Sequence, residues 1–194
     1  MRPIYIIIPT LNKQLGHSIG KMAQATAGCP STLLVMHDVK RQGFTKTVNE
    51  GIRLAPPISD ICLLNDDVTW YQWNWLEIQR RVLHSKHDIG LTGPTGDCGA
   101  VPIRNGLLGD FGTLAVGHIS FWCVLMKREM IEQIGLLDEA FIHYNSDSWY
   151  CKMMKRTGWK AVWVKSVFLK HKKHGSGKIV KWREQDIETY RSRR

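Results

Sequence analysis

The sequence predicts a single α/β domain with a mainly parallel central sheet and a short basic C-terminal tail. Its 194 residues fit one domain, because a single hydrophobic core stops growing at about 250 residues. A composition of 43% hydrophobic and 23% charged residues is typical of globular chains and excludes a disordered or fibrous one. In the first half, short β-branched runs alternate with helical patterns, as in parallel strands joined by crossover helices.

Short apolar runs are predicted to form the central strands. Polar or turn residues follow these runs, which is typical of buried parallel strands. Pro9 is expected to end the first strand, because proline cannot donate a backbone hydrogen bond to a neighbouring strand. The predicted strands span residues 4–8, 33–36, 61–64 and 89–92.

Helical periodicity is clearest after the second strand, where Phe44, Val48 and Ile52 recur on one helical face between residues 43 and 55. Beyond Val167 the basic tail shows little periodicity. Three further helices are expected, at 75–84, at 127–134 before Gly135, and from Asn145-Ser-Asp147 to about Thr157. A strand is expected at 114–126, and a long loop rich in Gly and Asp at 95–112.

Positive charge is concentrated in the C-terminal quarter. From Lys152 to Arg194 there are 14 Lys or Arg residues against 3 Asp or Glu, a net charge of +11, whereas the first 151 residues carry a net charge of −1. This asymmetry indicates an anionic partner for the basic quarter. The candidates are a phosphorylated ligand, a nucleic acid and an anionic membrane surface.

The sequence also predicts where the protein resides. It has no apolar run near the roughly 20 residues of a membrane helix, and its first apolar stretch is too short for a signal peptide. We therefore expect a cytoplasmic protein without an integral membrane segment. Its five cysteines are scattered and form no C-x-x-C pair, so they predict buried, reduced thiols and neither a disulfide framework nor a zinc knuckle.

Three polar side chains follow directly after a buried strand. They are Asn65, Asp66 and Asp67, at the carboxyl end of the apolar run 61–64. Open α/β sheets bind ligands at this edge, and oxygen ligands of this kind hold hard divalent cations. Asn and Asp also favour the turns that end strands. The local pattern leaves the metal site and the simple turn equally open.

Two further clusters carry candidate chemistry. Asp147 lies at the start of a predicted helix, where a carboxylate is stabilised in its charged form and can accept a proton; the alternative is that Asp147 only caps this helix and Asp138 only shapes a turn. The run from His171 to Gly177 combines imidazole, ammonium and flexible backbone, which suits a metal and phosphates. Its alternative is a solvated basic surface.

Taken in order, these clusters resemble a family-2 glycosyltransferase of the GT-A fold, close to the rhamnosyltransferase-like bacterial and phage members. The resemblance extends from Ile6 to about Gly177. It rests on the order and spacing of elements that are individually weak. These are Ile8-Pro9-Thr10, Asn49-x-Gly51, Leu64-Asn65-Asp66-Asp67, Gly93-Pro94, Gly135-Leu-Leu-Asp138-Glu139-x-Phe141, Asp147, and His171 with Gly175-Ser-Gly177.

The resemblance implies one Rossmann-like GT-A domain over residues 1–194, with a nucleotide-binding half at 1–92, an acceptor half at 93–167 and a basic tail at 168–194. It also implies the activity of a hexosyltransferase. The reaction would be a metal-dependent, inverting transfer of a sugar, which we expect to come from a UDP-hexose, to a hydroxyl group of a saccharide or other acceptor. The implied cofactor is Mn²⁺ or Mg²⁺.

The same resemblance implies roles for individual residues. Asp67 and His171 would hold the metal ion, and Asp147 would act as the catalytic base. Lys173 and Lys178 would join Lys172 over the donor diphosphate. The residues implied to bind the nucleotide sugar are Pro9, Thr10, Asp38, Lys46, Asn49, Asn65, Asp66 and Lys172.

Several positions depart from the pattern of the family. Asn65 occupies the first position of the D-x-D-type motif, so metal binding is expected to rest on Asp67. Ser146 stands in place of the usual glutamate before the base, and Trp149 in place of the usual second acid after it. Ser120-Phe121 stands where a small residue is common. These departures concern mainly the acceptor side.

The alternative function is a nucleic-acid or anionic-surface binding module that uses the basic C-terminal segment with Trp159, Trp163 and Trp182. It accounts for the charge but leaves the Asn65-Asp66-Asp67 run unexplained, and no recognition motif for nucleic acid is present. Nucleic acid is therefore not expected as a partner. A sugar nucleotidyltransferase is disfavoured as well, because residues 9–16 lack a glycine-rich nucleotide loop.

Overall fold

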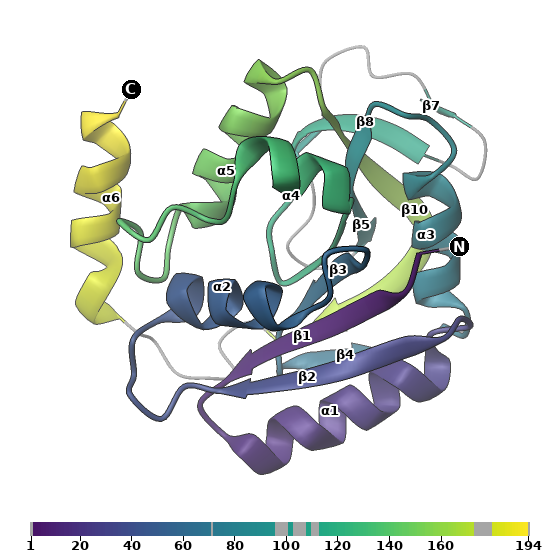
Figure 1. The fold of residues 1–194 in the computed structure, drawn as a ribbon, viewed down its shortest axis with the longest axis horizontal. Helices are drawn as coiled ribbons and strands as arrows, with labels where there is room; N and C mark the ends of the chain where they lie inside the picture. Colours follow the sequence, from purple (N-terminus) through teal and green to yellow (C-terminus); the bar gives the residue numbers. More distant parts are fainter. Residues whose placement is uncertain are drawn as a thin grey trace.

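A twisted sheet with helices on both faces forms the centre of the protein (Figure 1). The computed structural model describes residues 2–70, 72–95, 101–102, 108–109, 113–172 and 180–193. The strands of the described residues are β1 (Ile4–Thr10), β2 (Ser31–His37), β3 (Asp60–Leu64), β4 (Val68–Trp70), β5 (Ile89–Thr95), β6 (Val101–Pro102), β7 (Leu108–Gly109), β8 (Thr113–His118), β9 (Cys123–Met126) and β10 (Lys160–His171).

Most strands of this sheet point in one direction. The order is β2-β1-β3-β9-β5-β10-β8-β6, with β4 paired to β10 and β7 to β8. Strand β1 is parallel to both β2 and β3, and β5 is parallel to β10. Strand β9 inserts antiparallel between β3 and β5, so these two also run parallel to each other. The predicted mainly parallel sheet is confirmed.

The register brings the carboxyl ends of three strands to one edge. Thr10 at the end of β1 lies opposite His37 at the end of β2, and Ile7 lies opposite Leu63 of β3. The polar residues that follow β2 and β3 therefore meet beside Thr10. This edge is where open α/β sheets bind ligands.

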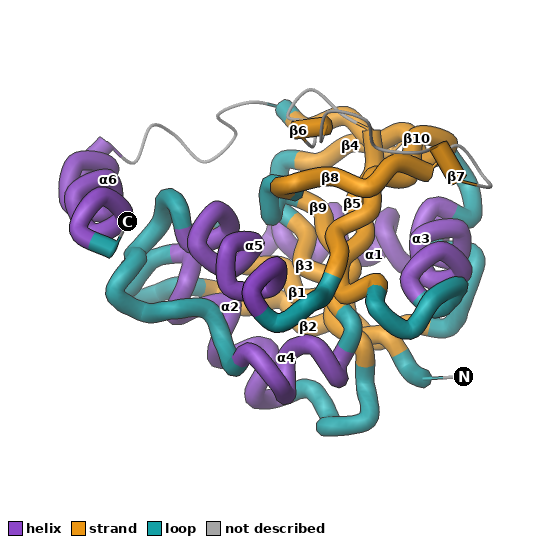
Figure 2. Tube along the Cα trace, turned by 90° about the horizontal axis from the view of Figure 1, so that it is seen from above, coloured by secondary structure: helices purple, strands orange, loops and turns teal. Residues whose placement is uncertain are grey.

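Two apolar cores cover the two faces of the sheet. Alternate residues of β1 point into different cores, with Ile6 and Ile8 in one and Ile7 in the other, as the pleat of a strand requires. Helices α1 and α3 cover the first core, and α2, α4 and α5 cover the second (Figure 2). The helices are α1 (Lys13–Thr26), α2 (Phe44–Leu54), α3 (Trp75–Leu83), α4 (Arg128–Ile134), α5 (Ser146–Arg156) and α6 (Arg183–Ser192), with the 3₁₀ turn η2 (Val180–Trp182) before α6.

The structure differs from the sequence-based expectations about elements at four points. Strand β1 continues through Pro9, because its pairing with β3 ends at Ile7 and the missing N–H of Pro9 lies where β1 has a neighbour on one side only. The single strand expected at 114–126 is two, β8 and β9, which occupy different places in the sheet. Helix α1 was not predicted. The tail also has more regular structure than expected, since β10 extends to His171 and α6 follows.

Two further features concern membrane segments and thiols. No helix of the described residues is long and apolar enough to cross a membrane. Cys62, Cys123 and Cys151 are buried free thiols, as expected, whereas Cys29 is only half-buried. Burial raises the pKa of Cys151 to about 12, which keeps this thiol protonated. Cys98 lies outside the described residues.

Candidate functional site

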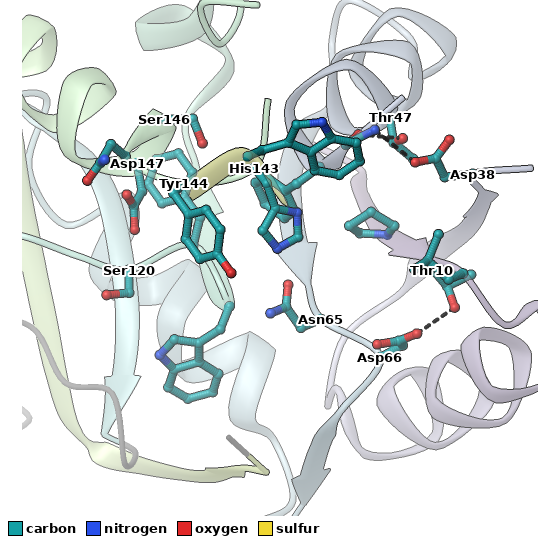
Figure 3. A pocket seen from close by; sticks show the side chains of 18 of the residues that line it. Thr10, Asp38, Thr47, Asn65, Asp66, Ser120, His143, Tyr144, Ser146 and Asp147 are labelled. Atoms are coloured by element: carbon teal, nitrogen blue, oxygen red, sulfur yellow. Dashed lines mark hydrogen bonds between the residues drawn. The ribbon is translucent and has the colours of Figure 1, made fainter. Parts of the chain in front are cut away.

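A pocket of about 930 Å³, here called the main pocket, opens at the edge where β1, β2 and β3 end (Figure 3). Most of the predicted donor residues line it, together with the predicted base and one predicted metal ligand. The lining residues are 9–11, Asp38, Lys40, Arg41, Gly43, Phe44, Thr47, 65–66, 120–122, 143–148, His171 and 181–182. The main pocket thus joins the strand ends to the segment before α5 and to the C-terminal region.

The residues after β3 fix one wall of the main pocket. The hydroxyl of Thr10 donates a hydrogen bond of 2.5 Å to Asp66 Oδ2, which ties the end of β1 to the end of β3. Burial raises the pKa of Asp66, and the hydrogen bond from Thr10 opposes this shift. The side chain of Asn65 extends into the main pocket (Figure 3), while its N–H donates to the carbonyl of Trp122 at 2.8 Å.

Asp67 and His171, the two predicted metal ligands, lie side by side. His171 Nε2 is 3.0 Å from Asp67 Oδ1, and the side chains are only 13% and 8% exposed. Two backbone contacts produce this proximity: β10 returns along β4, so that His171 lies opposite Val68, and Lys172 N–H donates to the carbonyl of Asp67 at 2.9 Å. The His171 ring also stacks on Trp122, with ring centres 5.3 Å apart.

The side chains of Asp67 and His171 supply two atoms of the kind that bind a divalent ion. His171 Nε2 and Asp67 Oδ1 are 3.0 Å apart and little exposed, and an imidazole nitrogen and a carboxylate oxygen are both common ligands of divalent ions. Among the described residues, no group of three or more His, Cys, Asp or Glu side chains is placed to hold a metal. Such an ion would therefore need phosphate oxygens and water as its other ligands, which is usual for Mg²⁺ beside nucleotides.

Asp38 shapes the loop between β2 and α2. Its two carboxylate oxygens accept the N–H groups of Gln42 and Gly43, each at 2.9 Å. The loop contains two residues of positive φ, Arg41 at 50° and Gly43 at 100°. A side chain at Gly43 would also collide with Ile142, since an added Cβ would lie 2.5 Å from its carbonyl oxygen. Asp38 therefore lines the main pocket as part of a fixed turn.

Three predicted donor residues do not line the main pocket. Lys46 is exposed and lines a second hollow of about 470 Å³. Lys172 is exposed, and its described contact is made through its backbone. Asn49 is fully buried, where its amide nitrogen donates to the carbonyl of Leu137 at 2.8 Å and its amide oxygen accepts the N–H of Leu137 at 3.0 Å. Lys173 and Lys178 lie outside the described residues.

The contacts of Asn49 predict a structural effect of mutation. Asn49→Ala leaves two buried backbone groups of Leu137 without partners, at about 1–3 kcal/mol each. We expect unfolding to become easier by about 3 kcal/mol and the melting temperature to fall by about 6–12 °C. Glu50→Ala, on the exposed side of the same helix, serves as control, and both are measured by urea and thermal unfolding. A variant that unfolds like the wild type but fails to bind UDP would instead make Asn49 a ligand-binding residue.

Asp147 faces the main pocket from the first turn of α5. Asn145 occupies the N-cap position with φ 62°, so the interpretation of Asp147 as the cap is wrong. Asp147 Oδ1 accepts the N–H of Ser148 at 2.7 Å, and Oδ2 lies 3.5 Å from His118 Nε2. The side chain is 24% exposed. His118, at the end of β8, was not predicted, because no local pattern marks it.

The other acids of the second cluster are engaged elsewhere. Asp138 forms an ion pair with Arg193 and accepts the N–H of Ala140. Glu139 accepts hydrogen bonds from Asn49 and Arg53, both at 3.0 Å, and these contacts lower its pKa. In the described structure neither carboxylate lines the main pocket. Asp147 is therefore the acid of this cluster that reaches it.

Sequence reasoning missed the wall formed by His143 and Tyr144. His143 and Tyr144 line the main pocket, and the His143 ring lies edge-on to Phe44 and Tyr144. Burial lowers the pKa of His143, so the ring is neutral at neutral pH. Lys181 and Trp182 of η2 line the same pocket. Only the aromatic content of the sequence hints at this wall.

Comparison with known proteins identifies the fold. No protein-family model matches the sequence, and no curated protein matches it. The structure is similar to the crystal structure of GalNAc-T7 with UDP, GalNAc and Mn²⁺, with a TM-score of 0.66 and 10% sequence identity. The match covers 87% of this chain and 43% of that chain, so this chain spans less than half the length of that protein. At this identity the likeness concerns architecture alone, and it agrees with the strand order: the chain folds as a GT-A-type α/β domain.

Proposed function

We propose that the protein transfers a sugar from a nucleotide-sugar donor to a hydroxyl group of an acceptor, with a divalent metal ion and with inversion at the anomeric carbon. The proposal makes it a hexosyltransferase similar to family-2 enzymes. The observation that carries it is the contact of Asp67 with His171 beside the main pocket. Two distant segments thereby place a carboxylate and an imidazole, both competent to bind a metal, at the carboxyl edge of the sheet.

The donor side would be built from the ends of β1, β2 and β3. Pro9, Thr10 and the turn fixed by Asp38 offer a surface for the nucleoside, and Asn65 and Asp66 lie beside it. Asp67 and His171 would hold Mn²⁺ or Mg²⁺, which when bound would neutralise charge that develops on the leaving diphosphate. We place the diphosphate near this pair, within reach of the exposed side chain of Lys172.

The acceptor side would be built around Asp147. Figure 3 shows Asp147 across the main pocket from Thr10 and Asp66. A base on the side away from the leaving group can take the proton of the attacking hydroxyl, which is the arrangement that inversion requires. In the proposed step the acceptor oxygen bonds to the anomeric carbon, the bond from that carbon to the diphosphate breaks, and the hydroxyl proton moves to Asp147.

The proposed donor is a UDP-hexose, because the structurally similar GalNAc-T7 was crystallised with UDP, GalNAc and Mn²⁺. The expected partner on the other side is a saccharide or other hydroxyl compound. A nucleic-acid or anionic-surface module would leave the Asp67–His171 contact and the placement of Asp147 without use.

Ligand-dependent unfolding tests this proposal. UDP at 100 times its dissociation constant adds about 2.7 kcal/mol of stability, so the melting temperature should rise by about 5–10 °C when Mn²⁺ is present. EDTA should remove most of the shift. The same panel includes UDP-hexoses and a single-stranded oligonucleotide. A shift with the oligonucleotide alone, lost at high salt, would refute the proposal in favour of the binding module.

A further inference from the structure

Helix α6 carries one fully buried carboxylate. Asp186 is 0% exposed, although the helix around it is polar, and it accepts three backbone N–H groups of one segment. Its oxygens lie 2.8 Å from the nitrogen of Ile142, 2.9 Å from that of His143 and 2.8 Å from that of Tyr144. Ile142 is 44 positions away in the sequence.

These contacts fix the orientation of three consecutive peptide groups. A buried carboxylate is costly unless hydrogen bonds compensate the loss of water, and hydrogen bonds to a charged acceptor are about twice as strong as neutral ones. Residues 142–144 belong to no helix or strand, so the hydrogen bonds of regular secondary structure do not orient their N–H groups. The carboxylate of Asp186 orients these groups instead.

A second attachment joins the end of α6 to the same region. Arg193 forms an ion pair with Asp138, and its guanidinium group lies 5.4 Å from the ring centres of both Phe141 and Trp149. Figure 1 shows α6 lying outside the layers around the sheet, beside the segment that joins α4 to α5. The helix is therefore fastened near both ends to residues 138–149.

The fastened segment forms one side of the main pocket. Residues 143–148, which include the proposed base Asp147, line the pocket directly after the peptide groups held by Asp186. The donor side comes from β1, β2, β3 and the Asp67–His171 contact. In the described structure the carboxylate of Asp186 accepts hydrogen bonds from residues 142–144 and does not line the main pocket, so its loss should act first on the segment that carries Asp147.

We propose that Asp186 is a positioning residue, which fixes residues 142–144 and thereby holds Asp147 in line for proton transfer without taking part in donor binding. This inference rests on the proposed function. Because displacements of about 1 Å at a reacting group can cost about 10²-fold in rate, loss of the three hydrogen bonds affects turnover far more than affinity for UDP.

The test compares Asp186→Asn with Glu184→Gln, a matched loss of an exposed carboxylate on the same helix. Three quantities are measured: the dissociation constant of UDP with Mn²⁺, kcat and KM for hydrolysis of a UDP-hexose, and hydrogen exchange of the amides of residues 142–144. For Asp186→Asn we expect faster exchange, unchanged UDP affinity and donor KM, and a kcat lower by about 10- to 100-fold. Glu184→Gln should match the wild type, and Asp186→Glu should restore part of kcat.

Unchanged kcat in Asp186→Asn, with faster exchange at residues 142–144, would overturn the proposal and leave Asp186 a purely structural residue. A loss of UDP affinity as large as the loss of kcat would also overturn the proposal. If Asp186→Asn fails to fold, Arg193→Gln loosens the second attachment, and the proposal requires it to lower kcat with UDP affinity intact. A wild type that neither binds UDP nor hydrolyses any UDP-hexose is a different result, which refutes the proposed function itself.

Discussion

Replacement of Asp67 by asparagine is expected to abolish manganese-dependent turnover and to remove the effect of Mn²⁺ on UDP binding. The carboxylate of Asp67 is the charged partner of His171 at 3.0 Å, and an amide oxygen is a much weaker ligand for a hard cation. We expect no replacement by the neighbouring acid, because Asp66 Oδ2 accepts the hydroxyl of Thr10 at 2.5 Å and His171 contacts Asp67. Excess EDTA acting on the wild type should reproduce the behaviour of the variant.

Asp66→Asn is the matched control for this experiment. It removes the same charge one residue away and keeps an oxygen that can accept the hydrogen bond from Thr10. UDP affinity is measured by isothermal titration of both variants with and without Mn²⁺, and turnover by release of UDP. Metal dependence should persist in Asp66→Asn and vanish in Asp67→Asn. The reverse pattern would move the proposed metal site to Asp66, and full turnover of the wild type in EDTA would remove it altogether.

The sheet could be predicted from sequence because its central strands are short, continuous apolar runs. Ile4, Ile6, Ile7 and Ile8 are all buried in β1, as expected for a strand covered on both faces. The apolar stripe of α2, with Val48 and Ile52 in the core, also agrees with its predicted span.

Helix α1 could not be found in this way, because its buried residues are Gly16, Gly20 and Ala23 with one large side chain, that of Ile19. Gly16 and Gly20 face β1 and β2 so closely that an added Cβ would lie 2.8 Å from Thr10 and 2.5 Å from Leu33. A helix that packs through glycine lacks the periodic large side chains on which the prediction relied. Its N-terminus does carry a signal, since Asn12 accepts the N–H of Leu15.

The candidate site could be predicted only in part, because it depends on contacts between segments that are far apart in the sequence. The placement of Asp67 beside His171 was expected only through the resemblance to a family, and the structure agrees with it. The burial of Asp186 and Asn49 had no sequence signal, because each is explained by backbone groups far away in the chain. For Asn49 the resemblance implies a ligand contact, whereas in the structure its side chain joins α2 to the backbone of Leu137.

Asp147→Asn is expected to lower turnover by about 10²- to 10⁴-fold, the usual contribution of general base catalysis, with UDP affinity unchanged. Asparagine keeps the shape of the side chain but cannot take the proton of the attacking hydroxyl. Folding should be preserved, since the N-cap of α5 is Asn145 and loss of one charge in the first turn costs only about 0.3–1 kcal/mol.

The measurement compares Asp147→Asn with Glu139→Gln, in UDP binding by titration and in hydrolysis of a UDP-hexose. Glu139 is held by Asn49 and Arg53 and does not line the main pocket, so its variant should turn over like the wild type. Two nearby acids are engaged elsewhere, because Asp138 is paired with Arg193 and Asp38 holds the N–H groups of its own loop. Full turnover by Asp147→Asn, with UDP still bound, would contradict the proposed role of Asp147 and move the base to another group that lines the main pocket, such as His143.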